Sequence, residues 1–234
     1  MPVHKNNTDN VPTARTTDED SKSNSTQSRN TPIIFSTNSE PYGFSYAEWT
    51  GRWWKWLLSI PVDTNPALDQ DGRYCTKGQE GPVWYLAGTT SKFMTANRFC
   101  TIPSGKCILF PIIASLSSFA EFPHLNMEEE ILSHVGKDLD RFIRLEVSVD
   151  QVKLQDPNQY RIRYGPFDLS FEQDNIWNIK PGTTRAVSDG FWTFLGPLID
   201  GEHIIHFSGV EPNFQTEVVY RILIKGFPNY KDAI

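Results

Sequence analysis

The distribution of apolar and polar residues divides the chain into a polar start and a longer, apolar-rich remainder. Residues 1–31 contain fifteen Asn, Ser or Thr residues and no aromatic residue. Such a segment cannot bury enough apolar surface to offset the entropy that it would lose on ordering. The pattern therefore predicts a disordered polar tail over residues 1–31, followed by a single β-sandwich domain over residues 32–234.

The first strongly patterned segment predicts a helix over residues 46–59. Ser45 and Glu48 have the spacing of a capping box, in which each side chain satisfies a backbone N–H of the other residue. Phe44 and Trp49 occupy the two positions of a hydrophobic staple. A proline follows the segment, and apolar residues recur along it at spacings of three and four, as on one face of a helix: Tyr46, Trp49, Trp53, Trp56 and Ile60.

After this helix the pattern changes to short apolar segments separated by turn residues. One further helix is expected over residues 127–135, with Asn126 as its cap. Turns at short intervals are typical of an antiparallel β-sandwich, immunoglobulin-like or jelly-roll-like. The predicted fold is therefore mainly β, with one N-terminal amphipathic helix and a second short helix. The expected strands are residues 83–87, 98–102, 107–113, 143–149, 160–164, 167–171, 191–195, 203–207 and 216–224.

The charge distribution argues against nucleic-acid partners. The formal net charge of the whole chain is -6, and residues 1–31 contribute zero to it because their charges cancel: Lys5, Arg15, Lys22 and Arg29 against Asp9, Asp18, Glu19 and Asp20. The domain therefore carries the whole negative charge, which does not favour binding to a phosphate backbone. No apolar run approaches the roughly 18 residues that a membrane helix needs, so no membrane span is expected.

The first residues and the cysteines bear on location. The segment from Met1 to Asn6 has no apolar stretch behind it that would mark a secretion signal, which predicts a cytoplasmic protein. The cysteines are Cys75, Cys100 and Cys107, and none of their spacings matches a zinc motif. They could form one disulfide with one spare thiol, or remain as three reduced thiols.

A series of short motifs runs through most of residues 45–224. It comprises Glu48-Trp49-x-x-x-Trp53-Trp54-x-Trp56, Ser59-Ile60-Pro61, Asn65-Pro66, Gly78-Gln79-x-Gly81-Pro82-Val83-Trp84, Cys100-Thr101-Ile102-Pro103-x-Gly105-Lys106, Asp189-Gly190-Phe191-Trp192 and Gly201-x-His203-x-Ile205-x-Phe207-x-Gly209. This pattern resembles a family of uncharacterised, mostly bacterial and archaeal proteins, many of them secreted. The resemblance implies an extracellular or cell-surface location and a Cys75–Cys100 disulfide. It implies no activity, because the family has none assigned.

Three residues are candidates for ligand binding. Trp54 lies off the apolar face of the predicted helix, so it could stack on a sugar ring or a partner, or be covered by a sheet. Trp177 is a second aromatic candidate. Gln79 lies among glycines, where its amide could bind a ligand or fix the loop by a hydrogen bond.

The candidates for catalysis are Glu48, Gln79, Asp189 and His203, although the capping box already accounts for Glu48. The sequence predicts no metal site and no cofactor. The residues that could contribute metal ligands are His203, His206, Asp63 and Asp69. His203 and His206 are three apart on a predicted strand, so their side chains should point to opposite faces.

Two functional hypotheses follow. The first is a non-catalytic ligand-binding or interaction module for a small molecule, a glycan, a cell-surface polymer or a protein. It predicts an exposed aromatic platform that includes Trp54 or Trp177. The alternative is a hydrolase or metal-dependent enzyme, and it predicts that at least two of the four catalytic candidates meet in one pocket.

Overall fold

The computed structural model describes residues 31–90, 94–137, 139–141, 144–212 and 214–226. Apart from Thr31, the tail predicted over residues 1–31 lies outside this part of the chain. Within the described residues, no helix has the length and apolar character needed to cross a membrane.

The helix predicted over residues 46–59 is confirmed as α1, Tyr46–Ser59. Ser45 caps it, and both hydrogen bonds of the capping box with Glu48 are present. The staple is also present, because the rings of Phe44 and Trp49 lie with their centroids 5.6 Å apart. Local sequence chemistry therefore sets where this helix begins.

The second predicted helix is confirmed as α2, Glu128–His134, but its cap differs from the expected one. The cap position is occupied by Met127, and Asn126 lies one residue before it. The Glu130 carboxylate accepts the backbone N–H groups of both residues. The acidic side chain thus satisfies two backbone donors just before the helix, and no cap by the Asn126 side chain is formed.

The strands of the described residues form two sheets, in the orders β1-β3-β7-β6 and β2-β9-β8-β4-β5. Short 3-10 turns cover Pro41–Gly43, Val62–Thr64, Leu139–Arg141 and Pro157–Tyr160. The strands are β1 Val83–Tyr85, β2 Met94–Pro103, β3 Cys107–Ser118, β4 Arg144–Val149, β5 Val152–Lys153, β6 Arg161–Phe171, β7 Gly182–Leu195, β8 Gly201–Glu211 and β9 Phe214–Lys225.

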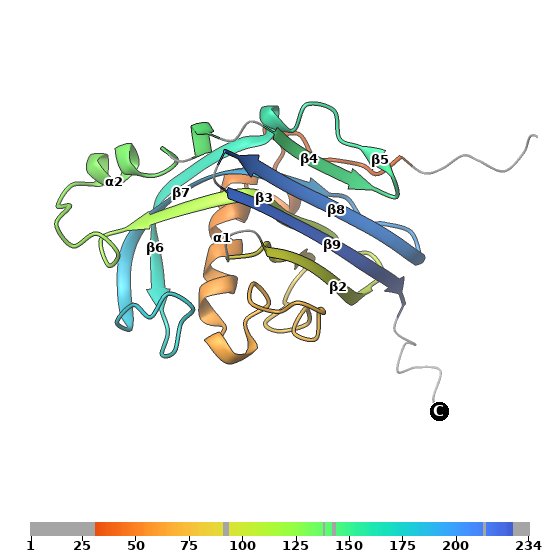
Figure 1. Ribbon diagram of the computed structural model, residues 1–234, viewed down its shortest axis with the longest axis horizontal. Coiled ribbons are helices and arrows are strands. Elements are labelled where there is room, and N and C mark those ends of the chain that lie inside the picture. Colours follow the sequence, from red (N-terminus) through yellow and green to blue (C-terminus); the bar gives the residue numbers. More distant parts are fainter. Residues whose placement is uncertain (1–30, 91–93, 138, 142–143, 213, 227–234) are drawn as a thin grey trace, which may run out of the picture. The chain divides into compact units, whose positions relative to one another are not determined.

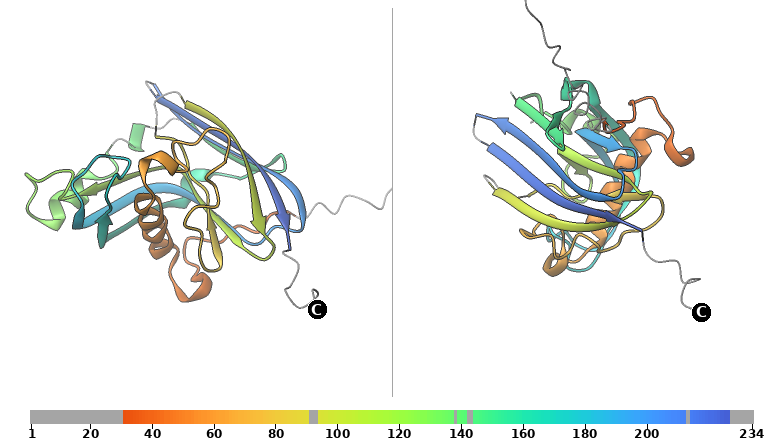
Figure 2. Two further views of the ribbon diagram at one scale, coloured as in Figure 1. Left: turned by 90° about the horizontal axis from the view of Figure 1, so that it is seen from below. Right: turned by 90° about the vertical axis from the view of Figure 1, so that its right-hand side faces the viewer.

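The mainly β prediction is confirmed, but the expectation of purely antiparallel pairing is wrong. β1 pairs with β3 in parallel, and β2 pairs with β9 in parallel over its whole length. The β2–β9 pair joins segments that are far apart in the chain, such as Cys100 and Ile222. Figure 2 shows β2, β9 and β8 as one layer of neighbouring strands.

Strand β3 has both faces buried, which explains its continuous apolar sequence. Successive side chains of a strand point to opposite faces. Leu109 belongs to a buried cluster that contains the apolar face of α1, whereas Ile108 and Phe110 belong to a second cluster shared by the two sheets. In the second cluster, Phe110 stacks on Phe207 of β8 with ring centroids 4.7 Å apart.

Helix α1 covers the other side of the four-stranded sheet and lies alongside β6 (Figure 1). Gly51 allows this approach, because a Cβ atom there would lie 2.5 Å from the ring of Tyr164. The face turned to the sheet carries Trp49, Trp53 and Trp56, all buried. Burial of a large apolar side chain contributes about 1.5–3 kcal/mol, so this face is a major source of stability.

The Cys75–Cys100 disulfide implied by the family resemblance is present. It joins the connection between α1 and β1 to strand β2. Cys107 is a free, buried thiol. The structure thus has one disulfide and one spare thiol, the first of the two arrangements that the sequence left open.

Candidate ligand pocket

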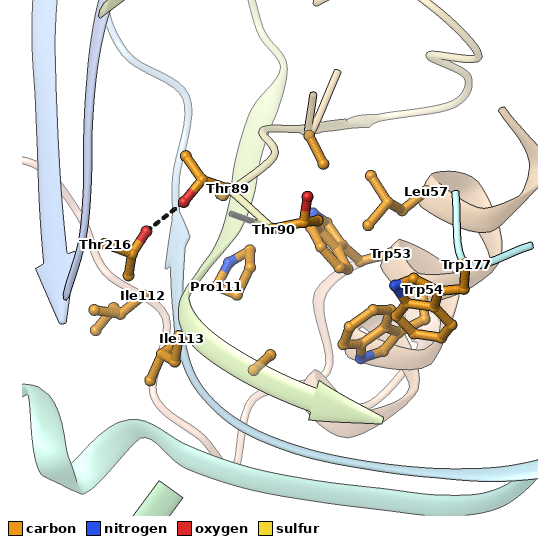
Figure 3. Close-up of a pocket in the computed structure, with 13 residues that line it drawn as sticks. Trp53, Trp54, Leu57, Thr89, Thr90, Pro111, Ile112, Ile113, Trp177 and Thr216 are labelled. Atoms are coloured by element: carbon orange, nitrogen blue, oxygen red, sulfur yellow. Dashed lines mark hydrogen bonds between the residues drawn. The ribbon is translucent and has the colours of Figure 1, made fainter. Parts of the chain in front are cut away.

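A cavity of about 250 Å³ lies where α1, β3 and the segment after β1 meet. Thr89 and Thr216 lie at one end of it, and Trp54 and Trp177 lie at the other end, where their rings overlap in the view of Figure 3. The described lining residues are Trp53, Trp54, Leu57, Ala67, Gly88, Thr89, Thr90, Pro111, Ile112, Ile113, Ala114, Trp177 and Thr216.

A break in the register of β3 shapes one wall of this cavity. The pairing of β3 with β7 shifts between Pro111 and Ile113. Proline has no backbone N–H for the ladder, which makes a strand irregularity at this position favourable. Such irregularities change the direction in which side chains point, and here the residues from Pro111 to Ala114 all line the cavity.

Three tryptophans form the aromatic wall. The ring centroids of Trp54 and Trp177 lie 5.6 Å apart, and those of Trp53 and Trp54 lie 5.0 Å apart. Trp54 is only 5% exposed, and Trp177 is half-buried. Of the two possibilities left open for Trp54, exposure and burial, the structure shows burial: Trp177 packs against it, and both residues line the cavity.

The indole nitrogen of Trp54 is buried and has no hydrogen-bond partner in the described residues. The adjacent Trp53 differs, because its N–H donates to the carbonyl oxygen of Leu86 at 2.9 Å. A buried donor without an acceptor costs about 1–3 kcal/mol.

The polar part of the lining consists of threonine hydroxyls. Thr89 and Thr216 hydrogen-bond each other through their Oγ1 atoms at 2.6 Å, and Thr90 is exposed at the rim. None of the described lining residues has a side chain that titrates near neutral pH. This lining offers no group for general acid–base catalysis, which uses side chains such as His, Glu and Asp.

Each of the four catalytic candidates already has local partners, and no described hydrogen bond or ion pair joins two of them. Glu48 caps α1, and its pKa is lowered first by the hydrogen bond from the Ser45 backbone. Asp189 is fully buried and pairs with Arg161 and Arg163 at 3.0 and 2.8 Å. These contacts engage both carboxylates in capping and ion pairing.

Gln79 fixes its own loop. Its amide nitrogen donates to the carbonyl oxygens of Cys75 and Tyr85, and its amide oxygen accepts the N–H of Tyr85 at 2.9 Å. These bonds resemble those of a strand partner to β1. Of the two interpretations open from the sequence, the loop-fixing hydrogen bond is the one that the geometry contains.

The two strand histidines differ in environment, as their spacing predicts. His203 is buried on the side of β8 that carries Ile205, and it hydrogen-bonds Asp150 through Nδ1 at 2.7 Å. His206 is partly exposed and hydrogen-bonds Glu217 at 2.9 Å. The opposite faces expected for this pair are confirmed.

The two acidic candidates for metal binding, Asp63 and Asp69, lie in different environments. Asp63 is exposed in a short 3-10 turn. Asp69 is buried, and its carboxylate accepts the backbone N–H groups of Asp71 and Tyr74. Among the described residues, no three His, Cys, Asp or Glu side chains gather as a metal-binding set.

The sequence identified part of this pocket and missed the rest. Trp54 and Trp177 were the two aromatic candidates, and both line the cavity. Gly88 to Thr90 and Thr216 were missed, because they belong to segments that only long-range strand pairing brings together. Pro111 inside an apolar strand was the available signal of an irregularity.

Comparison with known proteins gives little further information. No protein-family model matches the chain, and no curated protein matches it. Among solved structures, a chain from the "Structure of PbICP-C in complex with falcipain-2" aligns with a TM-score of 0.27 and 8% sequence identity. The alignment covers 62% of this chain and 100% of that chain. A TM-score this low carries no argument about fold or function.

Proposed function

We propose that this chain is a non-catalytic ligand-binding module that takes a small, largely apolar ligand into the cavity between α1 and β3. The observation that carries the proposal is a cavity with an aromatic lining that includes Trp54, whose indole N–H is buried without a partner in the described residues. Buried polar groups in folded proteins nearly always have a partner, and exceptions require an explanation. A bound acceptor is such an explanation.

The lining defines the class of ligand. Aromatic and aliphatic side chains with a few polar groups are the usual composition of small-molecule sites. A dry cavity of about 150 Å³ accepts benzene, so the 250 Å³ here leaves room for a somewhat larger compound. The ligand should have an apolar body that packs on Trp54 and Trp177, with at least one hydrogen-bond acceptor.

This lining favours such a compound over a glycan. A sugar carries several hydroxyl groups, each of which needs a partner when it leaves water. The described lining side chains offer threonine hydroxyls and indole N–H groups, with no carboxylate, amide or cationic side chain. The narrower proposal of a small apolar ligand therefore replaces the glycan and cell-surface polymer that the sequence suggested.

Binding of octanamide and 2-naphthamide tests this function. Each has an apolar body and an amide acceptor, and isothermal titration calorimetry would give the affinity. We expect saturable binding at one site. We expect Trp177→Ala to weaken it about tenfold or more, because aromatic packing and its buried area are lost.

Trp54→Phe is the matched test of the hydrogen bond, and Trp84→Phe is its control. Trp84 is also buried with an unpartnered indole nitrogen, but it does not line the cavity. We expect Trp54→Phe to reduce the affinity and Trp84→Phe to leave it unchanged. Equal effects of the two substitutions, or no binding by the unaltered protein, would contradict the proposal.

We further propose that the module works outside the cytoplasm and that its scaffold is a sandwich of the immunoglobulin or jelly-roll kind. The Cys75–Cys100 disulfide supports the location, because disulfides persist mainly in oxidising compartments. The buried cluster shared by the two sheets supports the scaffold. Both agree with the resemblance to a family of often secreted proteins.

A further inference from the structure

A buried arginine lies behind the wall of the cavity. Arg98 projects from β2 and is only 2% exposed. Its guanidinium donates to neutral oxygens: the carbonyl groups of Ala67, Asp69, Ala87 and Gly88, and the hydroxyl of Tyr220. Ala67 and Gly88 both line the cavity, so two residues of its wall hydrogen-bond the guanidinium through their peptide carbonyl groups.

This charge has no carboxylate partner among the described residues. Arg161 and Arg163 illustrate the usual arrangement, because both pair with the buried Asp189. The acid in the Arg98 network is Asp69, but it offers Arg98 its backbone carbonyl, while its carboxylate accepts two other backbone N–H groups. A buried cation that only neutral dipoles solvate gives its surroundings a positive potential.

Unpartnered donors add to this potential. The Trp54 N–H has already been described, and the indole nitrogen of Trp192 is likewise buried without a partner. Trp192 packs on Trp53 with ring centroids 5.3 Å apart. A Cβ atom added to Gly190 would lie 2.7 Å from both the Trp192 indole nitrogen and the Cβ atom of Ala114, so this donor is near a lining residue.

We propose that the ligand of this cavity is an anionic amphiphile, with an apolar body and a single carboxylate or similar acid group. This inference rests on the proposed binding function and adds the charge of the ligand to it. The apolar body packs on Trp54 and Trp177, and the acid group lies in the positive potential of Arg98. The lining contains no described acidic side chain that would repel it.

A matched pair of probes tests the charge without altering the protein. Octanoate and octanamide have the same chain and nearly the same shape, but only octanoate is charged near neutral pH. We expect octanoate to bind at least about tenfold more tightly, equivalent to about 1.4 kcal/mol. Equal affinities, or tighter binding of octanamide, would overturn the anionic preference and leave the binding function standing. Failure of both probes to bind would count against the binding function as well.

Two substitutions at Arg98 locate the origin of the preference. Arg98→Met removes the charge and keeps much of the apolar stem, whereas Arg98→Lys keeps the charge. We expect the ratio of the two affinities to fall toward one in Arg98→Met and to be retained in Arg98→Lys. An unchanged ratio in a folded Arg98→Met protein would overturn the role of Arg98. If that variant does not fold, the ratio measured for the unaltered protein still decides the charge of the ligand.

Discussion

Trp53 and Trp54 are neighbours in the sequence and in space, but only Trp53 uses its indole N–H. Their rings meet edge to face at a centroid distance of 5.0 Å, and both side chains are buried. Trp53 donates to the carbonyl oxygen of Leu86, the residue that follows β1. Trp53 thereby connects α1 to the sheet, while the indole N–H of Trp54 is buried and has no partner among the described residues.

This difference predicts unequal effects on stability. Trp53→Phe leaves the buried Leu86 carbonyl oxygen without its donor, whereas Trp54→Phe removes a donor that had no partner. Both substitutions shrink the side chain equally. We therefore expect Trp53→Phe to lower the free energy of unfolding by about 1–3 kcal/mol more than Trp54→Phe. Urea denaturation of the two variants measures the difference, and equal losses would show that the Leu86 hydrogen bond contributes nothing.

The local elements of the fold could be predicted from the sequence because their causes are local. The start of α1 depends on Ser45 and Glu48, which are three residues apart. Apolar runs located the strands, but the predicted strands were too short wherever part of a strand consists of polar residues. The first half of β7 contains Thr183, Thr184 and Arg185, and it was not recognised as a strand.

Long-range pairing and the pocket could not be predicted in the same way. Nothing in the sequence near Cys100 indicates that β2 pairs in parallel with β9. The segments 160–164 and 167–171 were expected to be two strands, but they form the single strand β6 with an irregularity between Tyr164 and Phe167. Strand β5 was missed because it has only two residues. The cavity combines residues of α1, β3, β9 and the segment after β1, which are distant in the sequence, so only its aromatic residues Trp54 and Trp177 were foreseen.

Gly72 should be among the positions least tolerant of substitution. Its φ angle is +90°, and an added Cβ would lie 2.2 Å from the carbonyl oxygen of Phe99. We expect Gly72→Ala to destabilise the protein by about 3 kcal/mol or more, from backbone strain and a backbone clash together. Gly105 is the control, because its φ angle is +82° and its surroundings are open. Gly105→Ala should cost only about 1–2 kcal/mol in thermal or urea unfolding.

The disulfide should contribute measurably to stability. The two cysteines are 25 residues apart in the sequence. In the chain-entropy description, closing a loop of this length stabilises the folded state by about 3.5 kcal/mol. We expect the variant with both Cys75→Ala and Cys100→Ala to lose about this amount in urea denaturation.

A thiol titration checks the same bond chemically. The unreduced protein should show one reactive thiol after denaturation, from Cys107, and three after reduction. Before denaturation Cys107 should react slowly, because it is buried. Three reactive thiols without reduction would contradict the disulfide.

Glu121 should make the free energy of unfolding decrease as the pH rises, which is the opposite of the effect of an acid whose pKa is lowered on folding. Burial raises its pKa from 4.5 to about 7, against the opposing hydrogen bonds from Ser118. Between these two values the folded chain keeps a proton that the unfolded chain has lost. The stability contributed by this group is therefore complete below about pH 4.5 and decreases as the pH rises to about 7.

Glu121→Gln should remove this dependence, because the amide stays neutral at every pH. The free energy of unfolding of the unaltered protein should fall between pH 5 and pH 7 relative to that of the variant, by up to about 3 kcal/mol. Urea denaturation at the two pH values measures this difference. Parallel pH profiles for the two proteins would show that the Glu121 carboxyl does not titrate in this range.

The connection between α1 and β1, which carries Cys75, also affects how readily two molecules can associate through their sheets. Strand β2 is at the edge of the five-stranded sheet, where unpaired backbone groups invite pairing with strands of other chains. The Asp71 carbonyl oxygen accepts the N–H of Phe99, and the Cys75–Cys100 bond holds the same connection against β2. The connection therefore covers part of this edge. Loss of the Cys75–Cys100 bond would expose β2 to pairing with strands of other molecules, which promotes aggregation.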